Sequence, residues 1–161
     1  SILLGQKDLF EVIELRGSIE LWSLLTLTEK YRETPESAKE AVQYLEEELS
    51  KIRTAIENNF LEDLVEADYN FHFSIIKSSG NNIFISLYEI IKSFMYEEIK
   101  HTYRDFDDLS FLMEEHVAFI QAVKTGDIIH AQNIIRDHIG IIKKKLLRQI
   151  QVKGTASPAA N

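Results

Sequence analysis

Residues 65–81 read VEADYNFHFSIIKSSGN, a stretch in which a helical apolar pattern carries two polar side chains on the same face. The residues at helical spacing form an inward stripe of Val65, Asp68, His72, Ile75, Ile76 and Ser79. Because Asp68 and His72 are one helical turn apart, their side chains lie on one face, about 6 Å from each other. Ser79-Gly80-Asn81 is typical of a helix stop followed by a new N-cap. We therefore predict a helix over about 61–78.

The rest of the chain has the same helical character. Six glycines and two prolines in 161 residues leave long uninterrupted segments. Apolar residues at helical spacing predict further helices. Their ranges are about 7–32, 35–58, 82–103, 109–124 and 128–151. Short connections between long helices are typical of antiparallel bundles. We therefore predict an all-α fold, an antiparallel bundle of six to seven helices.

Local signals support these helix ends. Thr34-Pro35 is typical of an N-cap followed by proline at the first helical position. Gly126-Asp127 pairs a glycine at a helix C-terminus with an N-capping aspartate. Gly17 lies inside the first predicted helix, where glycine costs about 1 kcal/mol relative to alanine. We expect a kink or a close helix contact there.

The length fits one domain with one core. We predict a single helical, ligand- and metal-binding domain over residues 1–151. It contains a short acidic connector at 105–108. Residues 152–161 are polar and small, and we predict that they form a flexible C-terminal tail.

Charge and cysteine content exclude several classes of protein. A formal net charge of −8 repels phosphate backbones, so the chain is not expected to bind nucleic acid by itself. The sequence has no cysteine, which excludes disulfides and thiolate metal sites and makes the cytoplasm the simplest compartment. No apolar run approaches the roughly 18 residues needed to cross a bilayer, so we expect no membrane partner. The first residues, SILL, are too short an apolar run for a signal peptide.

Two more of the predicted helices place a histidine on an apolar stripe. The stripe within 109–124 is Leu112, His116, Phe119, Ile120 and Val123. The stripe within 128–151 is Ala131, Ile134, Ile135, His138, Ile142 and Leu146. A buried carboxylate or imidazole is costly unless it is paired or bound to a metal. One divalent ion would satisfy Asp68, His72, His116 and His138 together.

Periodicity alone leaves two interpretations of these residues open. A lone inward histidine is more often a hydrogen-bonded core residue than a metal ligand, and Asp-x-x-x-His also forms plain ion pairs. His130 falls on the polar side of its helix, so we expect it to be solvated. Glu98-x-x-His101 has the spacing of a di-iron bundle, but such bundles need two of these motifs and the chain has one.

Four stretches follow one another in an order and spacing that match a known family. They are 67–76 with Ser79-Gly80-Asn81, 115–123 with Gly126-Asp127, 131–139, and 8–16 with Ile19-Glu20. Together they resemble the FadR-type C-terminal (FCD) domain, the effector-sensing half of many GntR-family bacterial transcription regulators. The resemblance covers about residues 8–147.

The resemblance implies a metal site. In the metal-binding members of this family an aspartate or asparagine and three histidines hold a divalent cation. The matching positions are Asp68, His72, His116 and His138, the same residues that the stripes bring inward. Carboxylate and imidazole ligands suit zinc or nickel best, with manganese or iron as alternatives.

The resemblance also implies an effector site. The arginine of the family's first helix, here Arg16, commonly faces the effector cavity and pairs with a carboxylate, a task that suits its planar fork of donors. Without the resemblance, an ion pair with Glu20 is the simpler interpretation of Arg16. Asn81 and Arg104 are further candidate ligand-binding residues. The expected effector is a small carboxylic acid.

The chain departs from the family pattern in two respects. It lacks the winged helix-turn-helix of some 70 residues with which these regulators begin. The chain is then either a lone sensor or an excised effector domain, and we expect the second, which contacts DNA only through a missing N-terminal domain. A homodimer is expected from the same resemblance. In addition, residues 21–25, LWSLL, stand where the family usually has an alanine-rich run, and the effector is therefore not named.

Three functions remain in view. The first is an effector-sensing domain, not an enzyme, which binds a small organic acid reversibly at the metal. The second is a mononuclear metalloenzyme, in which the metal activates water. That function needs a base beyond the ligands, and the sequence indicates no further inward carboxylate. The third is a structural helical interaction module whose histidines only form hydrogen bonds in the core.

Overall fold

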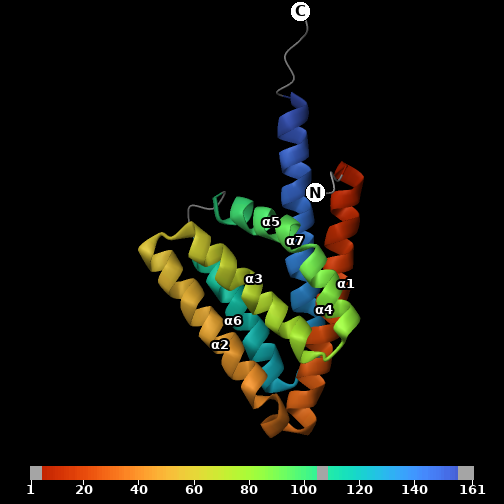
Figure 1. Ribbon diagram of the computed structural model, residues 1–161, viewed down its shortest axis with the longest axis vertical. Helices are drawn as coiled ribbons and strands as arrows, with labels where there is room; N and C mark the ends of the chain where they lie inside the picture. Colours follow the sequence, from red (N-terminus) through yellow and green to blue (C-terminus); the bar gives the residue numbers. More distant parts are fainter. Residues whose placement is uncertain (1–4, 105–108, 156–161) are drawn as a thin grey trace, which may run out of the picture.

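The computed structural model describes residues 5–104 and 109–155, which form helices and no strands (Figure 1). In chain order they are α1 (Gln6–Glu33), α2 (Pro35–Asn58), α3 (Leu61–Ser78), α4 (Asn82–Ile90), α5 (Lys92–Arg104), α6 (Ser110–Thr125) and α7 (Ile128–Thr155). The predicted all-α bundle is confirmed. The predicted connector at 105–108 lies outside the described residues.

Helix α3 occupies the middle of the bundle, in contact with α1, α2, α4 and α5. More of its surface is buried than one apolar stripe would cover. The buried residues are Leu64, Val65, Ala67, Asp68, Tyr69, Phe71, His72, Ser74, Ile75 and Ile76. Because this set includes a carboxylate and an imidazole, the neighbouring helices must supply partners for both.

The two longest helices, α1 and α7, run side by side in opposite directions (Figure 1). Gly17 lies at their contact. A Cβ atom at this position would meet Cγ1 of Ile139 at 2.8 Å. The close helix contact expected at Gly17 is therefore present, and α1 continues through it without interruption.

The single helix predicted over 82–103 is wrong. The structure has two helices there, α4 and α5, separated at Ile91, whose φ and ψ of −89° and 6° are not those of regular α-helix. Tyr88 before the break and Met95 after it are both fully buried. The break thus has no glycine or proline signal in the sequence, and it lies between two helices that both pack on α3.

The predicted turn signals are confirmed at two helix ends. Gly80 and Gly126 both have positive φ, +69° and +68°, which side chains rarely adopt. Asn81 then caps α4, because its side-chain oxygen accepts hydrogen bonds from the backbone N–H groups of Ile83 and Phe84.

The last helix is longer than predicted. Helix α7 continues to Thr155, beyond the expected end at 151. The remainder of the predicted tail, 156–161, lies outside the described residues. Among the described helices, none combines the length and the apolar character that a membrane span requires.

We predict that Gly17→Ala destabilises the protein. Overpacking against Ile139 outweighs the gain in helix propensity, so the free energy of unfolding should fall by about 1–2 kcal/mol in urea titrations. Gly140→Ala is the matched control on α7, because a Cβ there meets nothing within 4 Å. It should raise stability by about 0.5–1 kcal/mol. Equal gains in both variants would show that the α1–α7 contact is not tight.

Candidate metal centre

Three of the predicted ligands meet in the interior of the bundle. Asp68 and His72 come from α3 and His116 from α6, and one ligand atom from each lies within 4.8 Å of the others. The three residues are 6%, 0% and 2% exposed. Helical spacing puts Asp68 and His72 on one face, and the packing of α6 adds His116.

The ring nitrogens of the two histidines divide into two roles. Nδ1 of His116 lies 2.7 Å from the carbonyl oxygen of Leu112, and Nδ1 of His72 lies 2.5 Å from Oε1 of Glu20. When each histidine is neutral, a proton on Nδ1 faces an oxygen and Nε2 keeps its lone pair for the centre. The contact of His72 with Glu20 is an ion-pair contact and does not have the geometry of a hydrogen bond. Both Nε2 atoms lie 3.3 Å from Oδ1 of Asp68. Both are buried and have no hydrogen-bond partner among the described residues.

This geometry fits a metal ion. Ligand atoms about 2.1 Å from a tetrahedral ion lie about 3.4 Å from one another. The observed separations of 3.3 Å between Oδ1 and each Nε2 are close to that value. One carboxylate oxygen and two imidazole nitrogens are also a donor set that divalent transition metals accept. The residues present therefore fit a metal. An ion would use the Nε2 atoms of His72 and His116, which have no hydrogen-bond partner within residues 5–104 and 109–155.

His138, the fourth predicted ligand, lies beside the group of Asp68, His72 and His116 but is not part of it. The ring of His138, on α7, stacks on that of His72 with centroids 5.0 Å apart. Its Nε2 lies 3.1 Å from Nη2 of Arg16, and its Nδ1 contacts Oε1 of Glu115. Both nitrogens of His138 thus have protein partners.

Arg16 lies fully buried at the edge of the site. Its Nε donates to Oε2 of Glu20 at 2.9 Å, and its Nη1 donates to Oε2 of Glu98 at 3.1 Å. The alternative interpretation, an ion pair with Glu20, is therefore realised, but inside the protein. Burial alone would lower the pKa of Arg16, and the surrounding carboxylates, Glu20 first, outweigh burial and raise it.

Glu20 is the residue that the sequence interpretation missed. It is 0% exposed, although no further inward carboxylate was expected. Its position four residues after Arg16 was the available signal. Burial would raise the pKa of Glu20, but the charges of Arg16 and His72 outweigh burial and hold it well below its usual range. Glu20 thus stays ionised.

Two more residues that were not predicted orient the ligands. The hydroxyl of Tyr103 donates to Oδ2 of Asp68 at 2.7 Å, which leaves Oδ1 facing the histidines. Glu115, the residue before His116, contacts Nδ1 of His138 through Oε1. Burial would raise the pKa of Glu115, and the neighbouring His138 outweighs burial and lowers it. Outer partners of this kind fix the orientation of metal ligands.

The remaining predicted residues lie elsewhere. Asn81 is occupied as the N-cap of α4, and Arg104 is exposed. Neither lines the cavities next to the metal centre. His130 is exposed, as expected for a solvated residue. His101 is exposed as well, three residues from Glu98, and the described residues contain no second Glu-x-x-His motif.

Two neighbouring cavities lie on one side of the centre. The inner one, about 20 Å³, is bounded by Arg16, Asp68, His116 and His138 among others. The outer one, about 260 Å³, opens between α1, α5 and α7. Both cavities are lined by Glu98, Thr102, Ile142 and Lys145. The two cavities therefore adjoin beside the Arg16–Glu98 ion pair.

Comparison with known proteins gives a family and a structural neighbour. A family model described as "FCD domain" matches residues 11–140. No curated protein matches the chain. Among solved structures, E. coli McbR/YncC is similar with a TM-score of 0.68 and 21% sequence identity. The match covers 88% of this chain and 66% of that chain, so this chain spans about two thirds of its neighbour's length.

We predict that the metal-free protein loses stability between about pH 6.5 and 9. Burial alone would lower the pKa of His72, but Glu20 and Asp68 outweigh it and raise the pKa to about 9. The unfolded value is about 6.5. The stabilisation is therefore complete below pH 6.5 and is lost as pH rises through 9. His116 on α6 and His138 on α7 also face this ring.

Urea unfolding in chelator across this range measures the effect. His72→Gln should abolish most of the slope, and the exposed control His130→Gln should retain it. The same slope in the parent and in His72→Gln would contradict the assignment of the proton to His72.

Proposed function

The chain belongs to the FCD domain family of effector-binding regulatory domains, and we propose that it binds a small organic acid beside a buried divalent metal ion and signals to a DNA-binding domain. The observation that carries this proposal is the convergence of Asp68, His72 and His116, whose two Nε2 atoms have no hydrogen-bond partner in the part of the chain that the structure describes. A buried site of this kind is costly to keep empty and becomes favourable once an ion is bound.

The proposed ligands of the ion are Asp68, His72, His116 and His138. His138 would become a ligand if its Nε2 exchanged Arg16 for the metal, while its Nδ1 kept its contact with Glu115. Zinc or nickel suits this set best, with manganese or iron as alternatives. Positions on the ion that these side chains leave open are available to water or to an effector oxygen.

Arg16 is the proposed partner of the effector carboxylate. In the structure its Nη1 already binds a carboxylate, that of Glu98, at the junction of the two cavities. A carboxylate therefore fits this place. An incoming acid would replace Glu98 on Arg16, and the planar guanidinium suits a two-oxygen partner.

Displacement of Glu98 is also the proposed signal. Glu98 lies on α5, and its bond to Arg16 ties α5 to α1. An acid that takes this bond shifts the balance between two packings of these helices. In a homodimer of the complete regulator, that shift would alter the spacing of the DNA-binding domains. A regulator of this kind would act in the cytoplasm.

A metalloenzyme is the second candidate, because Glu20 is the additional inward carboxylate that such an enzyme needs. Glu20, however, already has three partners. Its carboxylate accepts a hydrogen bond from Arg16 at 2.9 Å and another from the Tyr88 hydroxyl at 3.4 Å, and it contacts Nδ1 of His72. Its pKa is lowered by Arg16 and His72 against the effect of burial. A carboxylate held in this way is a poor base for a water molecule. Reversible binding without turnover is therefore the proposal.

We predict about one divalent ion per chain in the purified protein, measured by elemental analysis after equilibration with zinc or nickel. His116→Ala and Asp68→Asn should each reduce metal affinity by roughly 10–100-fold or more. His130→Ala, an exposed histidine, should retain the full content. If His138 is a ligand, His138→Ala should reduce metal affinity as well; unchanged affinity would show that it is not one.

The third candidate, a structural module, predicts the opposite result. In that case EDTA would leave the melting temperature unchanged, and the parent would hold no more metal than His116→Ala does. Either observation would overturn the metal site.

We further predict that Glu98→Gln tightens the binding of small carboxylic acids to the zinc-loaded protein. The variant weakens the internal competitor for Arg16, so affinity should rise by roughly fivefold, the difference between a charged and a neutral acceptor. Calorimetry with a panel of aliphatic mono- and dicarboxylic acids measures it. Glu40→Gln removes the same charge from an exposed site on α2 and should change little. Equal changes of acid affinity in both variants would contradict the role of Arg16 as the partner of the effector carboxylate.

A further inference from the structure

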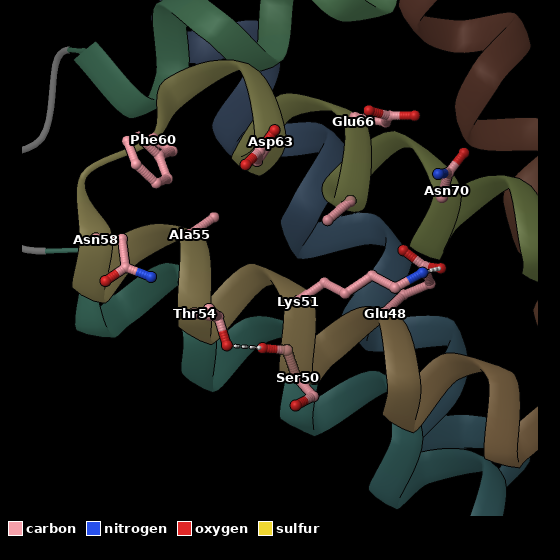
Figure 2. Close-up of a pocket in the computed structure, with 11 residues that line it drawn as sticks. Glu48, Ser50, Lys51, Thr54, Ala55, Asn58, Phe60, Asp63, Glu66 and Asn70 are labelled. Carbon is pink, nitrogen blue, oxygen red and sulfur yellow. Dashed lines mark hydrogen bonds and ion pairs between the residues drawn. The ribbon is translucent and has the colours of Figure 1, made fainter.

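A further cavity, apart from the two beside the metal centre, lies between α2 and α3 and has a volume of about 500 Å³ (Figure 2). It is lined on the α3 side by Glu66 and Asn70, which are offset by two residues from the metal-centre residues Asp68 and His72. Two residues correspond to about 200° around a helix, so the two sites occupy opposite faces of α3. We call this cavity the α2–α3 groove.

The groove contains a buried carboxylate with an unused oxygen. Glu48 is 0% exposed and lies on the apolar stripe of α2, between Leu45 and Ile52. Its Oε1 accepts a hydrogen bond from Nζ of Lys51 at 2.8 Å. Its Oε2 is buried and has no hydrogen-bond partner among the described residues. A buried carboxylate oxygen without a donor is unfavourable, and a cationic donor would correct this.

The rest of the lining has the same charge. Asp63 and Glu66 on α3 are exposed and form no ion pair within the described part of the chain. Against these two carboxylates and Glu48, Lys51 is the cation in the lining. The groove therefore attracts cations, and the acidic protein adds to this attraction.

A single metal ion does not fit these carboxylates. Among the described residues, Glu48, Asp63 and Glu66 do not form a group whose oxygens all lie within 4.8 Å of one another. Figure 2 shows Phe60 and Asp63 at one end of the groove and Glu48 with Lys51 at the other. The charges of a suitable ligand must be similarly spread out.

Two alanines give the groove an apolar strip within a lining that also contains polar side chains such as Thr54 and Asn58. Ala55 from α2 and Ala67 from α3 form part of the lining, and both are buried. Phe60 is 60% exposed at the end of the groove, where its ring offers a face to a cation. A chain of methylene groups suits the alanines, and ammonium groups suit the carboxylates and the ring.

We propose that the α2–α3 groove binds a linear aliphatic polyamine. One ammonium group donates to Oε2 of Glu48, and another lies between Asp63 and Phe60, with the methylene chain across Ala55 and Ala67. Thr54 is not required for this, because its hydroxyl already donates to the Ser50 carbonyl oxygen. The site is separate from the metal centre and does not depend on the proposed function.

Spermidine is the probe, titrated into the full chain at low ionic strength and followed by calorimetry and by backbone amide NMR. We expect saturable binding with one site, and shifts confined to α2 and α3 around Lys51, Thr54 and Asn70. Glu48→Gln should weaken binding by roughly tenfold or more, because a charge-assisted hydrogen bond is lost. Hexylamine, with one charge, should bind more weakly than spermidine.

Two controls separate a built site from general attraction to an acidic protein. Glu57→Gln removes an exposed carboxylate of α2 that does not line the groove, and should change affinity less than about twofold. Asp63→Asn, on the surface, tests the other end if Glu48→Gln folds poorly. Equal losses in Glu57→Gln and Asp63→Asn, shifts spread over the whole surface, or no saturation at millimolar spermidine would each overturn the proposal.

Discussion

Arg16 donates in three directions from the middle of α1: to Glu20 on its own helix, to Glu98 on α5 and towards His138 on α7. Glu20 in turn contacts His72 on α3. A guanidinium in the interior is tolerated only when each of its charges and donors has a partner. The bundle therefore has to bring these helices to one point, and the apolar core surrounds a polar centre.

This arrangement supports the proposal that the centre serves regulation and not catalysis. The buried charges of Arg16 and Glu20 are compensated by other side chains, so the proposed ligand would enter by exchanging partners. The proposed exchange at Arg16 would release Glu98, and the proposed metal would bind Asp68, which accepts a hydrogen bond from Tyr103. Both outer partners belong to α5. An event at the centre thus acts directly on that helix.

Helix α3 has two polar faces, which is unusual for a central helix. One face carries Asp68 and His72 toward the metal centre, and the other carries Asp63 and Glu66 toward the α2–α3 groove. Each face lies opposite a buried charged residue of a neighbouring helix, Glu20 on α1 and Glu48 on α2. Because both faces belong to one helix, a ligand at the proposed metal centre and a ligand in the α2–α3 groove would both contact α3.

By itself the sequence determined the helices, most of their ends and which residues point inward, since these depend on neighbours within one or two turns. Asp68, His72, His116 and Arg16 were found in this way, the last with help from the family resemblance. The break at Ile91, the buried state of Glu20 and the partners of His138 were decided only by the tertiary structure. Periodicity gives the face of a helix on which a side chain lies, but which side chains meet there depends on how distant helices pack.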